Sequence, residues 1–246
     1  MLMEKKIGKE KQLYKYKALF QLIYDICVVT FIVIVSSEHM INKGYTFARM
    51  CRFWTMWSCW GCALYFFVSF CKQMTLLLTG NYTHNESQWT VKIVHFIIDA
   101  LQQLAVVLCL CVSAMFWILF IKSPKAVFRV SDDWQPSFME QMFVTHFEHS
   151  FPLLFLLIDC LVFNQGNKRT ELYYNKSKYI PVATAVGYCI LAIHDYVRFS
   201  IRPYPFLDKM EIGGLLVFAF LFTCIVAFIL NPLAHFIRRV TYSLKV

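Results

Sequence analysis

The stretch IVHFIIDALQQLAVVLCLCVSAMFWILFI, residues 93–121, is apolar over almost its whole length. About 20 consecutive apolar residues are enough for a helix to cross the hydrocarbon core of a bilayer, so this stretch predicts a transmembrane helix. Hydrophobic residues make up 59% of the chain, and similar stretches recur on both sides of this one. The sequence therefore predicts an all-α polytopic membrane protein, a bundle of six transmembrane helices. The expected spans are Ala18–Ser36, Phe53–Phe70, Ile93–Ile121, Gln141–Phe163, Tyr179–Ile201 and Ile212–Ile237.

The connections between these spans are too short for a separate soluble domain, so residues 1–246 are expected to form a single transmembrane domain. The formal net charge is +9, but Lys and Arg lie between the apolar stretches rather than on a basic face with interleaved aromatic residues, and no nucleic-acid partner is expected. Lys and Arg are enriched before the first span, which favours both termini in the cytosol. We expect an integral multi-pass protein of the endoplasmic reticulum, endomembranes or plasma membrane; the sequence leaves the organelle and the oligomeric state open.

Ionisable residues within the predicted spans fall into two groups by depth. Each costs about 2.5 to 3.5 kcal/mol on insertion scales, so each indicates either a function or a partner. The group expected toward the cytosolic ends of the helices is Asp25, His95, Asp99 and Asp159, and the group expected toward the opposite face is His146, Glu148, His149, His194, Asp195 and Arg198.

Three spans bring a hydroxyl and two imidazoles into the leaflet opposite the termini. At a rise of 1.5 Å per residue, Thr55, His149 and His194 lie about 3, 12 and 10 Å below the predicted boundary. His146 shares a helix face with His149, whereas Glu148 is rotated by about 100°. Helical spacing also places four small residues in one stripe, which predicts close helix packing: Thr55, Ser58, Cys59 and Cys62.

Two pairs of residues at helical spacing predict local ion pairs. Asp195 and Arg198 lie at i and i+3, and His95 and Asp99 at i and i+4, so each pair would meet on one helix face. Both pairs are interpreted as structural rather than catalytic.

The sequence resembles the androgen-induced and androgen-dependent TFPI-regulating family of six-span membrane proteins, which act as threonine hydrolases. The resemblance runs through most of the chain and is strongest in its second half. The segments that carry it are Arg52–Thr55, Phe116–Ile118, His146–Leu154, Ile193-His194 and Tyr204–Asp208.

The resemblance implies that Thr55 is a nucleophile and His149 its catalytic histidine. The implied substrates are fatty acid esters of hydroxy fatty acids, lipids that would enter from the bilayer, and no cofactor or metal is expected. The chain departs from the family pattern at Thr145, where Asn is usual, and at Asp195, where a second histidine is common.

A threonine hydroxyl becomes a good nucleophile when a base removes its proton, and an imidazole suits that role. A third group usually orients the base, and His146, His194 and Asp195 are the candidates. Two other readings of the histidines stay open: a haem-binding electron-transfer protein ligated by His194 with His149 or His146, and a zinc site built from the same three histidines. A non-enzymatic membrane regulator is the remaining alternative.

Overall fold

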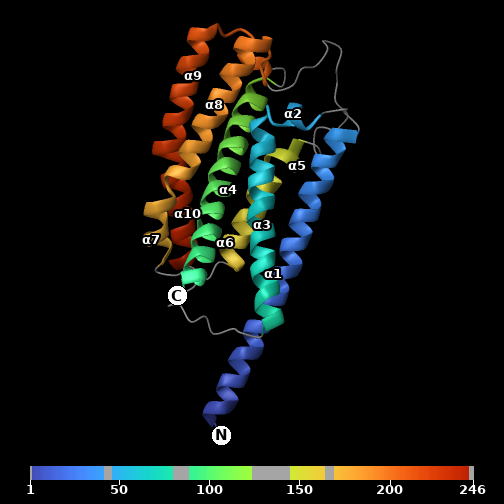
Figure 1. The fold of residues 1–246 in the computed structure, drawn as a ribbon, viewed down its shortest axis with the longest axis vertical. Coiled ribbons are helices and arrows are strands. Elements are labelled where there is room, and N and C mark those ends of the chain that lie inside the picture. Colours follow the sequence, from blue (N-terminus) through green and yellow to red (C-terminus); the bar gives the residue numbers. More distant parts are fainter. Residues whose placement is uncertain (1, 42–45, 80–88, 124–144, 164–168, 244–246) are drawn as a thin grey trace.

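The computed structural model describes residues 2–41, 46–79, 89–123, 145–163 and 169–243, and the elements in these ranges are all helical (Figure 1). The prediction of an all-α polytopic membrane protein is therefore confirmed. The helices are α1 (Leu2–Ile41), α2 (Phe47–Met50), α3 (Trp54–Thr79), α4 (Trp89–Lys122), α5 (Thr145–His149), α6 (Phe151–Val162), α7 (Arg169–Ser177), α8 (Tyr179–Phe199), the 3-10 turn η3 (Pro205–Leu207), α9 (Ile212–Ile225), the π-helical turn η4 (Val226–Leu230) and α10 (Asn231–Ser243).

Five helical segments in the described part of the chain are long and apolar enough to cross a membrane. They match five of the six predicted spans and extend beyond most of their expected boundaries. These segments are Gln12–Ser37, Trp54–Thr79, Val91–Lys122, Tyr173–Phe199 and Ile212–Val240.

The prediction of one continuous helix over Gln141–Phe163 is wrong. Residues 141–144 lie outside the described residues, and the remainder is divided at Ser150 into α5 and α6. Helix α6 has 12 residues, which rise about 18 Å, less than the hydrocarbon thickness of about 30 Å. Pro152 explains the division, because proline has no N–H to donate to the carbonyl four residues earlier, that of Glu148.

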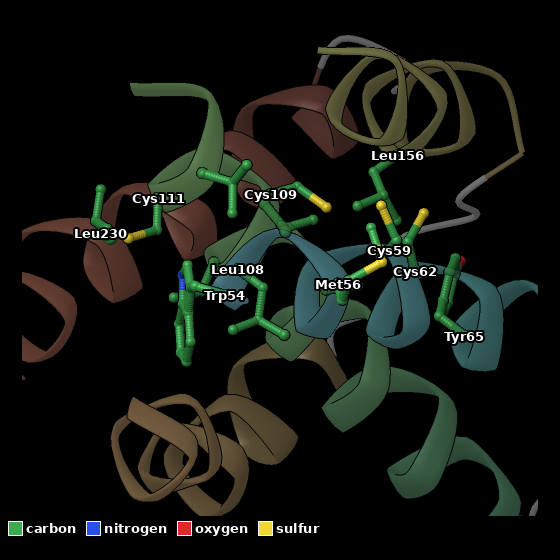
Figure 2. Packing of buried hydrophobic residues seen from close by; sticks show 14 of the residues in the cluster. Trp54, Met56, Cys59, Cys62, Tyr65, Leu108, Cys109, Cys111, Leu156 and Leu230 are labelled. Atoms are coloured by element: carbon green, nitrogen blue, oxygen red, sulfur yellow. The ribbon is translucent and has the colours of Figure 1, made fainter. Parts of the chain in front are cut away.

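The core of the bundle lies where α3 packs against α1 on one side and α4 on the other. The predicted small-residue stripe of α3 is buried, as expected for close packing. Gly61 permits the approach of α4, since a Cβ at this position would lie only 3.0 Å from Leu108 Cδ1. Figure 2 shows Cys59 and Cys62 of α3 on the side that faces Leu156 of α6.

A buried polar network joins α3, α4, α6 and α10. Asp159 Oδ2 accepts hydrogen bonds from Tyr65 Oη at 2.6 Å and from Gln102 Nε2 at 2.9 Å. Gln102 Oε1 in turn accepts from Arg238 Nε at 3.1 Å, and Arg238 forms an ion pair with Asp99. The sequence had predicted His95 as the partner of Asp99; the observed ion pair is with Arg238, far along the chain. These contacts explain how an apolar bundle accommodates two aspartates.

Both termini and α7 lie at one end of the bundle, whereas α2 and the connection between α8 and α9 lie toward the other (Figure 1). This arrangement agrees with the prediction that both termini face the same side of the membrane. It also places Asn175, on α7, on that side.

Replacement of Arg238 by leucine should strongly destabilise the protein. The Arg238 side chain is fully buried, and removing one partner of a buried ion pair leaves the other charge uncompensated, at about 3 to 5 kcal/mol. The measurement is the unfolding midpoint of the purified protein in detergent. Arg239→Leu is the matched control, because Arg239 is exposed; equal midpoints for the two variants would contradict a stabilising role for the network.

The three sequons at Asn81, Asn85 and Asn175 should remain unglycosylated, since cytosolic asparagines do not meet the glycosylation machinery. Asn81 and Asn85 lie outside the described residues. Endoglycosidase treatment of protein from eukaryotic cells should leave its electrophoretic mobility unchanged. Arg129→Asn creates a sequon in the loop predicted on the opposite side and should gain a glycan; a glycan on the natural protein would reverse the orientation.

Candidate active site

One pocket lies between α3, α4, α5, α8, α9 and the connection that contains η3. It holds about 720 Å³ of empty space, including the part open to its surroundings. Four polar side chains interrupt its apolar wall: Thr55, His149, Tyr188 and Tyr204. The apolar lining consists of Trp54, Val112, Met115, Phe116, Leu119, Cys189, Ala192, Ile193, Phe206, Leu207, Leu215, Phe218, Ala219 and Phe222.

Thr55 is the second residue of α3, at the end of the helix that opens into the pocket. The first N–H groups of a helix have no acceptor within the helix, and the Thr55 N–H is oriented toward Tyr204 Oη at 3.4 Å. The Thr55 Oγ1 is also 3.4 Å from Tyr204 Oη. The threonine hydroxyl is thus buried beside a tyrosine hydroxyl.

Tyr204 belongs to the connection between α8 and α9, outside the membrane-spanning helices. Burial raises the pKa of its phenol above the ordinary value, while hydrogen bonds with Thr55 lower it by less. The phenol is therefore protonated at neutral pH and can donate a hydrogen bond.

His149 is the last residue of α5, at the division between α5 and α6. Its ring stacks on Phe116 of α4, with centroids 3.7 Å apart and planes 27° apart. Its carbonyl accepts a hydrogen bond from the Ser113 hydroxyl of α4. Side chain and backbone of His149 are therefore both fixed by α4.

The division between α5 and α6 exposes backbone carbonyls that would cost several kcal/mol in hydrocarbon if they had no donor. Cys59 Sγ lies 3.9 Å from the Glu148 carbonyl, which loses its helical donor at Pro152, and Cys62 Sγ lies 3.7 Å from the Pro152 carbonyl at the start of α6. Each thiol is a weak donor. The small residues of α3 therefore donate hydrogen bonds to carbonyls near the helix break, in addition to allowing close helix packing. It ties the segment that carries His149 to the helix that carries Thr55.

The structure places the predicted catalytic pair, Thr55 and His149, in one pocket, and each residue is 7% exposed. The side chain of His146 lies outside the described part of the structure, so its supporting role stays a prediction. Glu148 is buried and is not among the pocket-lining residues, in keeping with its predicted rotation away from His149.

Asp195 pairs with a residue distant in sequence rather than with its helical neighbour. Its Oδ2 is 2.8 Å from Arg52 Nε, so the predicted local pair with Arg198 is wrong. Tyr188 Oη donates to the Arg52 carbonyl at 3.0 Å. Arg52 lies two residues before the first residue of α3, and these contacts therefore anchor the start of the helix with Thr55 to α8.

His194 does not line the pocket that contains His149. Its side chain is 56% exposed, and its Nδ1 lies 3.3 Å from Asp195 Oδ1. The haem and zinc hypotheses both need His194 near His149 or His146, and the described residues do not bring His194 and His149 together. Among those residues, no three His, Cys, Asp or Glu side chains form a group that could hold a metal ion.

Sequence reasoning did not identify Tyr204 as a site residue. Tyr204 entered the sequence analysis only as the first residue of the segment Tyr204–Asp208, which carries the family resemblance. No local pattern reports a contact between Tyr204 and Thr55, which are 149 residues apart.

Comparison with known proteins agrees with the resemblance at the level of the family. The family described as FAR-17a/AIG1-like protein, which is the androgen-induced family, matches residues 16–239. No curated protein and no solved structure matches the chain significantly. Because the match covers most of the sequence, this integral multi-pass membrane protein belongs to the FAR-17a/AIG1-like family.

Proposed function

We propose that the protein is a membrane-embedded hydrolase that cleaves the ester bond of fatty acid esters of hydroxy fatty acids. The observation that carries this proposal is that Thr55 and His149, from helices separated by α4 in the chain, line the same apolar pocket. Family membership fits a hydrolase role in a membrane. The ester specificity and the residue roles rest on the resemblance and on this geometry.

Thr55 acts as the nucleophile and His149 as the general base. The imidazole takes the hydroxyl proton as Thr55 Oγ1 bonds to the ester carbonyl carbon, and it returns this proton to the departing oxygen of the hydroxy fatty acid. Water activated by the same imidazole then hydrolyses the acyl-threonine. Stacking on Phe116 restricts the His149 ring to one plane, which favours a fixed direction of proton transfer.

The pocket wall suits a lipid substrate. Its aliphatic and aromatic side chains can bury an acyl chain, with a gain of about 25 cal/mol for each Å² of apolar surface removed from water. The Tyr204 hydroxyl lies 3.4 Å from Thr55 Oγ1, so the ester would bind there while the chains extend along Met115, Phe218 and Phe222. Such a substrate would enter laterally from the bilayer.

Thr55→Ala and His149→Ala should each abolish hydrolysis of a fatty acid ester of a hydroxy fatty acid in membranes, with losses of about 10³-fold or more, because each variant removes an indispensable group. Thr55→Ala should also lose labelling by a fluorophosphonate. Thr184→Ala is the matched control, because the Thr184 hydroxyl bonds to the Ile180 carbonyl of its own helix. Full turnover by both site variants would refute the assignment.

The ion pair between Arg52 and Asp195 should position Thr55 without taking part in the chemistry. Arg52→Asp and Asp195→Arg should each lower turnover by roughly 10- to 100-fold, because small displacements of reacting groups are costly. The double variant restores opposite charges and should recover most of the activity. If Asp195 instead orients the catalytic histidine, the exchange cannot restore turnover, and the double variant will be as inactive as Asp195→Arg.

A further inference from the structure

Tyr204 presents a hydroxyl to the residue proposed as the nucleophile. Its Oη lies 3.4 Å from both the amide nitrogen and the Oγ1 of Thr55, and its side chain lines the pocket. Tyr188 also lines the pocket, but its hydroxyl donates to the Arg52 carbonyl. Of the described pocket-lining hydroxyls, that of Tyr204 therefore lies beside the position where a bound ester would react with Thr55.

The Tyr204 ring is held in place from several sides. Pro203 and Pro205 restrict the backbone on either side of it. Phe53 meets the ring edge-on with centroids 5.9 Å apart, and Phe206 stacks on it with centroids 5.7 Å apart. The Tyr204 carbonyl accepts a hydrogen bond from the Leu207 N–H at 3.0 Å. A hydroxyl held in this way can stabilise charge without reorganisation during a reaction.

The Tyr204 hydroxyl lies near Thr55, the Trp54 N–H and the Tyr188 hydroxyl, and its contacts with Thr55 are long. A distance of 3.4 Å is long for a hydrogen bond between two hydroxyls, whose usual separation is about 2.7 to 2.8 Å. If the Tyr204 hydroxyl donates instead to a better acceptor in the pocket, it therefore loses only a weak hydrogen bond with Thr55. Burial keeps the phenol protonated by raising its pKa, and the Thr55 N–H beside it is a second hydrogen-bond donor.

We propose that the Tyr204 hydroxyl is a catalytic group that stabilises the oxyanion formed when Thr55 attacks the ester; this role rests on the proposed function. As the bond between Thr55 Oγ1 and the carbonyl carbon forms, the Thr55 proton passes to His149 and the carbonyl π electrons move to the oxygen. The Tyr204 O–H and the Thr55 N–H donate hydrogen bonds to this oxygen. Its electron pair then re-forms the carbonyl, the bond to the hydroxy fatty acid oxygen breaks, and that oxygen takes the proton from His149.

A purely structural role of the Tyr204 hydroxyl predicts a different effect of its removal. The hydroxyl also accepts a hydrogen bond from the Thr55 N–H at the start of α3, so its loss could destabilise the helix without affecting the reaction. The two roles separate in the kinetics, because stabilisation of an oxyanion acts on the transition state and leaves substrate binding nearly unchanged.

Tyr204→Phe, which removes one oxygen atom, tests the proposal. Its kcat for the ester should fall by roughly 10²- to 10³-fold with little change in KM, the magnitude that loss of one oxyanion donor produces. The rate constant of fluorophosphonate labelling should fall as well, because the phosphonyl oxygen would bind in the same place. Tyr24→Phe is the matched control, because the Tyr24 hydroxyl donates to the Phe155 carbonyl at 2.7 Å, away from the pocket; it should keep the kcat of the unaltered chain.

Two results would overturn the role of Tyr204 and leave the hydrolase assignment intact. One is an unchanged kcat in Tyr204→Phe while Thr55→Ala is inactive. The other is a loss of activity that follows only a lowered unfolding midpoint, with normal kcat per folded molecule counted by complete fluorophosphonate labelling. Full hydrolysis by Thr55→Ala would instead refute the proposed function, and the role of Tyr204 with it.

Discussion

The missing N–H of Pro152 is the constraint on which the candidate site depends. Within hydrocarbon, a backbone carbonyl without a donor costs several kcal/mol, so a broken helix is tolerated only where neighbouring groups supply donors. Here α3 supplies the Cys59 thiol and α4 supplies the Ser113 hydroxyl. The same contacts hold the histidine at the break against α4. The contacts that stabilise the helix break therefore also determine the position of His149.

The bundle separates two kinds of buried polarity. Near the end that carries the termini, Asp99, Asp159 and Arg238 form a network with the side-chain amides of α4, in which Arg238 pairs with Asp99 and Asp159 accepts from Gln102. At the pocket, the polar groups are an imidazole and hydroxyls, with apolar side chains around them. A hydrogen-bonded network that includes an ion pair favours a rigid structure, whereas polar groups beside empty space can change their partners when a ligand binds. This difference supports the pocket, rather than the network, as the reactive region.

Much of the architecture could be predicted from the sequence, because bilayer thickness sets the length of an apolar helix. The prediction that Thr55 and His149 share one site agrees with their place in one pocket, whereas the depth estimate for His149 was counted from Gln141, which lies outside the described residues. The break at Ser150 was missed because apolar composition continues through it, and proline often occurs in transmembrane helices. The partners of Asp99 and Asp195 were missed for another reason: helical spacing reports only neighbours on one helix, whereas Arg238 and Arg52 approach from other segments. The contact between Tyr204 and Thr55 is of the same long-range kind.

The 149 residues that separate Thr55 from Tyr204 also set a temporal order. A ribosome delivers α3 to the membrane long before it reaches the connection between α8 and α9, and both α8 and α9 contribute to the pocket wall. The threonine hydroxyl therefore spends most of synthesis without its tyrosine neighbour and without an enclosed pocket. Whatever chemistry this hydroxyl performs, it becomes competent only when α8 and α9 have been inserted, so chains that end before α9 carry an incomplete site.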